Sequence, residues 1–181
     1  ELIKFKMETS LITTKTNWLL DQAHSEIGFK IRHMMISNVK GTFKTYDANI
    51  TTILKDFTTA VIDLWIDASS INTGDATRDQ HLKSADFLNA DKYKQILFKS
   101  NSIGQIDKDG NQELSGELTM LGITKTIKLN VEFGGLVKDP WGNEKAGFTI
   151  TGKINRKYWG LIWNTPMETG GIMVGDDISI S

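Results

Sequence analysis

Residues 24–43 read HSEIGFKIRHMMISNVKGTF and carry the clearest backbone pattern in this sequence. Ile27, Phe29 and Ile31 alternate with glycine and charged residues, and this period of two is typical of a strand that buries one face. The alternation breaks at residues 32–36, where apolar side chains follow one another, and then resumes. We therefore predict one sheet element that a short apolar segment interrupts before the element continues.

The interruption carries two adjacent methionines, Met34 and Met35. Methionine side chains are flexible and polarizable, so they suit a surface that adapts to an irregular apolar partner. The alternative is that both side chains simply fill gaps in the core. The residues alone leave both interpretations open.

The segment AHSEIGFKIRHMMISNVKGTF at 23–43 resembles the signature of the YceI-like family, and nearly everything after Asn17 resembles that family in order. The resemblance is specific because several long segments agree rather than one short pattern. It implies a bacterial, lipocalin-like protein whose closed antiparallel barrel holds a polyisoprenoid or a similar lipid chain, and it implies no chemistry. The other matching segments are WLLDQAHS at 18–25, DASSINTGDATRDQHLKSADFLNADKY at 67–93, GELTMLGITKTIKLNVEFGG at 116–135, KDPWGNEKAGFTITGKINRKYWGLIWN at 138–164 and ETGGIMVGDDISI at 168–180.

The rest of the chain predicts an all-β protein, an antiparallel eight-stranded lipocalin-like barrel with a short-helix lid segment. About eight strands with one apolar row each, joined mostly by short turns, are typical of such a barrel. Residues 67–92 break the strand pattern, with short helices predicted at 67–70 and 77–87, and a polar connector of this length is typical of a lid. Periodicity does not distinguish a hollow barrel from a filled one, and the family resemblance implies a hollow one.

We expect a flexible N-terminal arm at 1–16 and a single YceI-like barrel domain at 17–181. The N-terminus lacks the apolar core of about 7–15 residues that a secretory signal needs. No run approaches the roughly 18 apolar residues needed to cross a bilayer. We therefore expect a soluble cytoplasmic protein, with a periplasmic or secreted protein as the alternative if a signal peptide was removed.

Charge and composition exclude several classes of function. Lysine and arginine number 21 against 22 aspartates and glutamates, which gives a net charge of −1, so we expect no nucleic-acid partner. The absence of cysteine excludes disulfides, thiolate catalysis, iron–sulfur clusters and cysteine-ligated zinc. Neither a Gly-x-Ser-x-Gly nucleophile motif nor a glycine-rich phosphate loop occurs. We predict no cofactor and no catalytic residue.

The ionisable side chains give no clear metal or catalytic site. His24, His33 and His81 are the three histidines, and their spacing does not support convergence on one metal ion. Residues 107–111 superficially resemble a calcium loop, but no glutamate closes it, and we interpret them as a hairpin turn. Asp63 is the one carboxylate within an apolar run, and simple solvent exposure is its alternative reading.

The candidate ligand-binding residues are apolar side chains expected to line the barrel and four cationic or imidazole side chains expected at its mouth. A long isoprenoid removes a large apolar surface from water when it binds, at about 25 cal/mol per Å², and an apolar channel provides for this. For each lining residue, ordinary core packing is the alternative. The lining residues are Phe29, Ile31, Met34, Met35, Val39, Phe43, Phe87, Phe98, Leu118, Met120, Leu129 and Phe148, and the mouth residues for a polar or pyrophosphate head are Arg32, His33, Arg78 and His81.

We therefore predict a lipid-binding protein that holds a polyisoprenoid, an isoprenoid quinone or a fatty-acid derivative for storage or transport. One alternative is an enzyme acting on a lipid-like substrate in the barrel, with His33, Asp63 and His81 as candidate polar groups. Another is an interaction protein whose barrel is filled. A homodimer is also predicted, from the family resemblance and from large aromatic residues expected at the surface. These aromatic residues are Trp65, Trp141 and Trp159.

Overall fold

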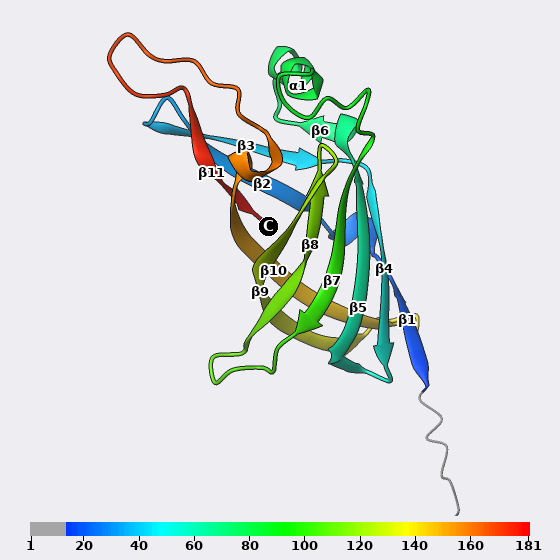
Figure 1. Cartoon of the computed structure of the whole chain (residues 1–181). Helices are drawn as coiled ribbons and strands as arrows, with labels where there is room; N and C mark the ends of the chain where they lie inside the picture. Colours follow the sequence, from blue (N-terminus) through cyan, green and yellow to red (C-terminus); the bar gives the residue numbers. More distant parts are fainter. Residues whose placement is uncertain (1–13) are drawn as a thin grey trace, which may run out of the picture.

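The computed structural model describes residues 14–181, which form one curled antiparallel sheet with a single short α-helix beside it (Figure 1). The strands are β1 (Lys15–Leu19), β2 (Ile27–His33), β3 (Ser37–Phe43), β4 (Tyr46–Ile53), β5 (Asp56–Asp67), β6 (Ile71–Asn72), β7 (Gln95–Ile103), β8 (Asn111–Met120), β9 (Ile123–Lys138), β10 (Glu144–Asn155) and β11 (Val174–Ile180). The helices are α1 (Ala76–Lys83) and the 3-10 turns η1 (Gln22–His24), η2 (Ala68–Ser70) and η3 (Arg156–Trp159).

The sheet curls because two paired segments turn a corner together. Neighbouring strands follow the order β1-β4-β5-β7-β8-β9-β10-β11-β2-β3-β6. The chain runs directly from β3 into β4 through Lys44 and Thr45, while β5 runs through η2 into β6. Backbone hydrogen bonds hold this corner, from the Lys44 N–H to the Ser70 carbonyl at 3.1 Å and from the Asp67 N–H to the Thr45 carbonyl at 2.9 Å. Strands near the two ends of this order are therefore connected covalently, because β3 continues into β4 and β5 continues into β6.

The antiparallel barrel-like class is confirmed, but residues 14–181 form eleven strands rather than the predicted eight. The two bends divide two long strands into four, and β1 adds a further strand beside β4. The bend at Lys44 and Thr45 shifts the inward row by one residue, from Phe43 to Tyr46, and the bend at η2 falls where the strand pattern breaks at residue 67. Residues 1–13 of the predicted N-terminal arm lie outside the described residues, and the last two of the arm, Lys15 and Thr16, belong to β1.

The apolar segment within residues 24–43 is a hairpin turn, so the prediction of one continuing element was wrong. Strands β2 and β3 pair over their whole length, from Ile27 opposite Phe43 to His33 opposite Ser37. Residues 34–36 form the turn, and the chain reverses there. Two antiparallel neighbours repeat the same alternation, and a period of two carries no information about chain direction.

The predicted lid segment contains the expected short helices. Asp75 caps α1, because its side chain accepts a hydrogen bond from the Arg78 N–H at 3.0 Å, and this bond lowers the pKa of Asp75. Buried Asp79 accepts hydrogen bonds from the backbone and hydroxyl of Thr73 at 2.8 and 2.6 Å. These bonds fasten the helix to the end of β6. The helix ends at Lys83, four residues before the predicted end.

The core lies on the concave side of the sheet. Strand β8 alternates cleanly, with Leu114 only 1% exposed and its neighbours Leu118 and Met120 also buried. Gly116 lies in the same inward row, where a Cβ atom would come within 2.3 Å of the Phe98 ring. The glycine therefore allows that ring to lie directly against the β8 backbone. Each large apolar side chain buried in this way contributes about 1.5–3 kcal/mol.

Candidate functional site

The concave face has two parts whose apolar side chains differ in how well they are covered. On β7, β8 and β9 the inward row is buried, and we call these residues the packed wall. On β2, β3 and β11, and at Ile150 of β10, the large apolar side chains of the inward row are only half-buried, and we call these residues the open wall; Ile154, further along β10, is buried. The register places the open-wall residues side by side, since Ile31 lies opposite both Val39 and Ile178. The packed wall is Ile96, Phe98, Leu114, Leu118, Met120, Ile127, Leu129 and Val131, and the open wall is Phe29, Ile31, Val39, Ile150, Ile178 and Ile180.

Four aromatic rings meet at one end of the concave face, and we call them the end cluster. Phe57 of β5 contacts Trp18 of β1 at a centroid distance of 4.9 Å. It also contacts Phe133 of β9 at 5.7 Å and Phe148 of β10 at 4.8 Å. Strands β7 and β8 separate β5 from β9 in the sheet, so these contacts cross the interior of the curl. The end cluster therefore narrows this end of the barrel.

Two ion pairs join the start of β10 to Asp21, just after β1, and to Lys55, in the turn between β4 and β5. The Lys145 ammonium lies 2.8 Å from the Asp21 carboxylate, and the Lys55 ammonium lies 2.5 Å from Glu144. The hydrogen bonds from Lys145 and His24 lower the pKa of Asp21 from 3.8 to about 2. The start of β10 is thereby tied to the opposite side of the sheet. Both pairs are solvent-exposed, which limits their contribution to stability.

At the opposite end of β5, the lid segment meets the loop between η3 and β11. His81 of α1 packs edge-on against Phe87 at a centroid distance of 5.1 Å and against Trp163 of the loop at 4.9 Å. Phe87 and Trp163 also touch, at 5.1 Å. The His81 Nε2 atom lies 2.8 Å from an Asp86 carboxylate oxygen. We call His81, Phe87 and Trp163 the lid cluster, and it joins two segments that are far apart in the sequence.

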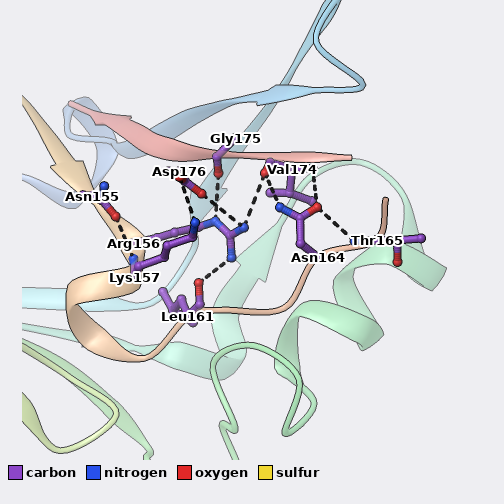
Figure 2. A network of polar contacts seen from close by, with 9 residues as sticks. All are labelled: Asn155, Arg156, Lys157, Leu161, Asn164, Thr165, Val174, Gly175 and Asp176. Atoms are coloured by element: carbon purple, nitrogen blue, oxygen red, sulfur yellow. Dashed lines mark hydrogen bonds and ion pairs between the residues drawn. The ribbon is translucent and has the colours of Figure 1, made fainter. Parts of the chain in front are cut away.

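A buried arginine anchors the loop that carries Trp163. Figure 2 shows Arg156, at the start of η3, pointing its guanidinium toward the backbone of β11. The guanidinium donates to the Gly175 carbonyl at 2.8 Å, to the Val174 carbonyl at 3.4 Å and to the Leu161 carbonyl. Asn164 adds a second fastening, because its side chain both donates to the Val174 carbonyl at 2.7 Å and accepts from the Val174 N–H at 3.0 Å.

The irregular pairing of β11 explains why a buried cation sits there. The β11–β2 register shifts between Val174 and Ile178, and a bulge leaves backbone groups without ladder partners. Arg156 supplies hydrogen bonds to two of these carbonyls. Burial lowers the pKa of Arg156, and the nearby Asp176 carboxylate opposes that change. Asp176 itself is paired with Lys157 at 2.9 Å.

The structure distributes the predicted ligand-binding residues over several places. Four lie in the packed wall, three in the open wall, Phe148 in the end cluster, and Phe87 and His81 in the lid cluster. Phe43 is half-buried and packs against the core. Their contact with a ligand stays a prediction. The packed-wall members are Phe98, Leu118, Met120 and Leu129, and the open-wall members are Phe29, Ile31 and Val39.

Met34 and Met35 lie outside the barrel interior, because the turn that carries them is exposed. The predicted mouth residues are also divided between two elements. Arg32 and His33 lie at the end of β2, whereas Arg78 and His81 lie on α1. Arg78 donates to the Thr73 hydroxyl at 2.8 Å and the Thr73 carbonyl at 3.1 Å. Within residues 14–181, no hydrogen bond or ion pair joins the two pairs of mouth residues.

Sequence reasoning missed most of the end cluster and the anchor of the loop. Trp18 and Phe57 lie at strand ends, where alternation gives little information about direction. Trp163 ends an aromatic-rich segment at residues 158–163, whereas its partners Phe87 and His81 were among the predicted residues. Arg156 lies between charged and aromatic residues and looks like a surface cation, although it is 1% exposed.

The ionisable candidates are scattered. Asp63 is exposed and lies 3.7 Å from Lys99 on the outer face, which agrees with the solvent-exposed interpretation. His24 lies in η1, His33 at the end of β2 and His81 in α1. The described residues contain no group of three histidines or carboxylates placed to hold a metal ion.

The three tryptophans that supported a homodimer do not share a surface. Trp159 is 1% exposed and donates to the Leu118 carbonyl at 2.9 Å, so it belongs to the core. Trp65 and Trp141 are exposed. The aromatic argument for a homodimer was therefore wrong for Trp159, and dimerisation stays a prediction.

Comparison with known proteins identifies the family. Residues 18–181 match the family described as YceI-like domain. The chain belongs to the YceI-like family. A UPF0312 protein of Staphylococcus aureus strain USA300 is 40% identical over 164 residues, which cover 90% of this chain and 92% of that protein. The crystal structure of a Campylobacter jejuni YceI protein has 41% identity and a TM-score of 0.65, over 78% of this chain and 82% of that one.

A more distant solved structure shares the YceI-like fold. It is a polyisoprenoid binding domain from Saccharophagus degradans, with 14% identity and a TM-score of 0.60, over 90% of this chain and 92% of that one. The predicted family and the bacterial character of its members are confirmed. Within residues 14–181, no helix of this YceI-like chain has the length and apolar content needed to cross a bilayer.

Proposed function

We propose that this YceI-like protein binds a long apolar molecule of the isoprenoid class along the open wall, for storage or transport. The observation that carries the proposal is the incomplete burial of the open wall. Its side chains face the concave side of the sheet, yet they remain half-exposed while the packed wall beside them is covered. An apolar chain lying against them would remove that surface from water, at about 25 cal/mol per Å².

The two ends of the concave face differ in chemistry, and this difference favours one orientation of the ligand. The end cluster narrows one end with four apolar rings, which suits the tail of the ligand. The lid end carries Arg78 and His81, which suit a polar or anionic head. Membership in the YceI-like family and the shared fold of the polyisoprenoid binding domain from Saccharophagus degradans support this class of ligand.

We infer a binding protein rather than an enzyme. The inward rows of the sheet are largely apolar, and the carboxylate considered for catalysis, Asp63, lies on the outer face in an exposed ion pair. An isoprenoid needs an apolar surface and few hydrogen bonds, and the side chains of the open wall supply such a surface.

Native mass spectrometry tests the proposal. We expect protein purified under gentle conditions to carry an apolar molecule, and delipidated protein to take up an added polyprenol. Ile150→Glu places a charge in the open wall, where binding would remove it from water. We expect this substitution to weaken polyprenol binding by about ten-fold or more, which corresponds to about 1.4 kcal/mol.

Thr149→Glu is the matched control, because Thr149 is the exposed neighbour of Ile150 on the other face of β10. We expect this control to bind polyprenol like the unmodified protein. The proposal is wrong if protein from cells carries no apolar molecule and none is taken up. Equal weakening by both substitutions would also contradict it, since the effect would then not depend on the open wall.

A further inference from the structure

The tip of the β2–β3 hairpin exposes a compact apolar group. The turn consists of Met34, Met35 and Ile36, which are 44%, 55% and 83% exposed. The backbone of the turn is nevertheless held firmly, because the Met34 N–H donates to the Met173 carbonyl at 2.7 Å. Figure 1 shows the hairpin and the loop before β11 leaving the sheet together at one corner of the molecule. The tip therefore projects apolar side chains from a defined position.

The backbone of this turn is unfavourable for the residues that occupy it. Met34 has φ of 50° and Met35 has φ of 61°, so two consecutive methionines adopt the left-handed conformation. Turns of this kind favour asparagine and glycine, which tolerate positive φ. Met35 packs part of its side chain against Gly171 of the loop before β11, yet both methionine side chains remain largely accessible to water. Two such residues in succession at an exposed apolar tip lead us to a hypothesis of function at this turn.

The hairpin is also cationic. Residues 27–43 contain Lys30, Arg32 and Lys40 and no acidic residue. Lys30 and Lys40 lie directly opposite each other, and like charges in that position repel. None of the three forms an ion pair within residues 14–181. The adjoining loop and β11 carry Glu168, Asp176 and Asp177, and Asp176 is already paired with Lys157.

The cationic surface continues away from the tip along the outer face of the sheet. Lys153 lies opposite Ser179, which in turn lies opposite Lys30. These side chains and Lys128 line an open groove of about 960 Å³, in which Glu26 is the one acidic residue. Lys128 is the one lysine of this row with an ion-pair partner in the described part of the chain, Glu113 at 2.9 Å. The row is therefore complementary to an anionic surface.

We propose that the β2–β3 hairpin docks on an anionic lipid bilayer, with Met34, Met35 and Ile36 inserted among the lipids. Arg32, Lys30 and Lys40 would then contact the lipid phosphates. The spacing fits, because Lys30 lies four residues from Met34, or about 13 Å along a strand. Apolar groups of interfacial proteins enter about 5–10 Å into the boundary between headgroups and acyl chains. The docking surface lies outside the open wall, so it is testable apart from ligand binding.

Vesicle flotation tests the docking surface. We expect the protein to bind vesicles that contain phosphatidylglycerol, to bind phosphatidylcholine vesicles much less, and to lose binding as salt is raised. The double substitution Met34→Asn with Met35→Gly keeps the left-handed turn and removes most of the apolar tip. We expect it to reduce vesicle binding by about ten-fold or more, with an unchanged or higher thermal midpoint and unchanged uptake of polyprenol.

The β4–β5 turn offers a matched control. Leu54 is 60% exposed with φ of 53°, so it is also an apolar residue in the left-handed conformation at a hairpin tip. Its neighbour Lys55 is already paired with Glu144. We expect Leu54→Asn to leave vesicle binding unchanged, whereas Lys30→Gln with Lys40→Gln reduces binding to phosphatidylglycerol vesicles alone.

Three outcomes would overturn the docking proposal. One is a protein that does not bind phosphatidylglycerol vesicles at low salt. Another is binding that survives the Met34 and Met35 substitutions. The third is a dimer in solution that the same substitutions dissociate, without any vesicle binding, because the tip would then be a contact with a second copy of the chain.

Discussion

The packed wall and the open wall have the same alternation of apolar residues, yet only one of them is covered. The difference comes from segments outside the sheet. Trp159 and Leu161 from the region of η3, and Leu88 and Ala90 from the lid segment, are buried in the core beside the packed wall. The open wall has no comparable cover among the described residues. In this fold, strands provide an apolar surface and the connections decide how much of it stays available.

The largest expected effect is a difference in stability between substitutions in the packed wall and in the open wall. Leu114→Ala leaves a cavity in a fully buried site and should lower the free energy of unfolding by about 3 kcal/mol. Ile178→Ala in the open wall should cost about 1 kcal/mol, because a half-exposed side chain loses less burial. Urea denaturation of delipidated protein measures both values. Equal losses would show that the two walls are packed alike.

The next effect concerns the loop that closes the lid end. Arg156→Met removes three hydrogen bonds to backbone carbonyls and should lower the free energy of unfolding by about 2 kcal/mol. Hydrogen exchange should also accelerate in residues 160–173. Lys157→Met is the control, because its ion pair is exposed and should contribute about 0–1 kcal/mol. Unchanged exchange in Arg156→Met would contradict the anchoring role.

The smallest effect is a pH dependence that involves the Asp21–Lys145 ion pair. The pKa of Asp21 falls from 3.8 to about 2 in the folded protein. A depressed folded pKa contributes stability that is present above pH 3.8 and disappears as the pH falls toward 2. Asp21→Asn should therefore lower the thermal midpoint slightly near neutral pH and flatten its decline in this acid range. Lys145→Gln should reproduce most of the change. If the thermal midpoint of both variants falls with acid as in the unmodified protein, the Asp21–Lys145 pair is not the cause of that fall.

Alternation in the sequence was enough to identify the buried face of most strands. Leu118, Met120 and Leu129 were expected inside, and all three are buried there. The short helices of the lid segment were also recognisable, because Asp75 and the polar run after it break the strand pattern. These features depend on local interactions, which the sequence records directly.

Other features depend on contacts that are remote in the sequence. Trp18 and Phe133 join one cluster only because the sheet curls, and no local pattern shows which strands the curl brings together. Arg156 is buried because β11 has a bulge that the sequence does not show. The exposure of Met34 and Met35 follows from a chain reversal that alternation does not reveal. Long-range geometry therefore decides much of the candidate site.

The place of β11 has a consequence for biosynthesis. This strand lies between β10 and β2, so the last strand of the sheet to leave the ribosome joins one of the first. Until it arrives, β10 and β2 each present an unpaired edge, and such edges invite pairing with other chains. Pairings that distant in sequence also slow folding. The nascent chain therefore carries two unpaired strand edges until β11 has been synthesised and has paired with both of them.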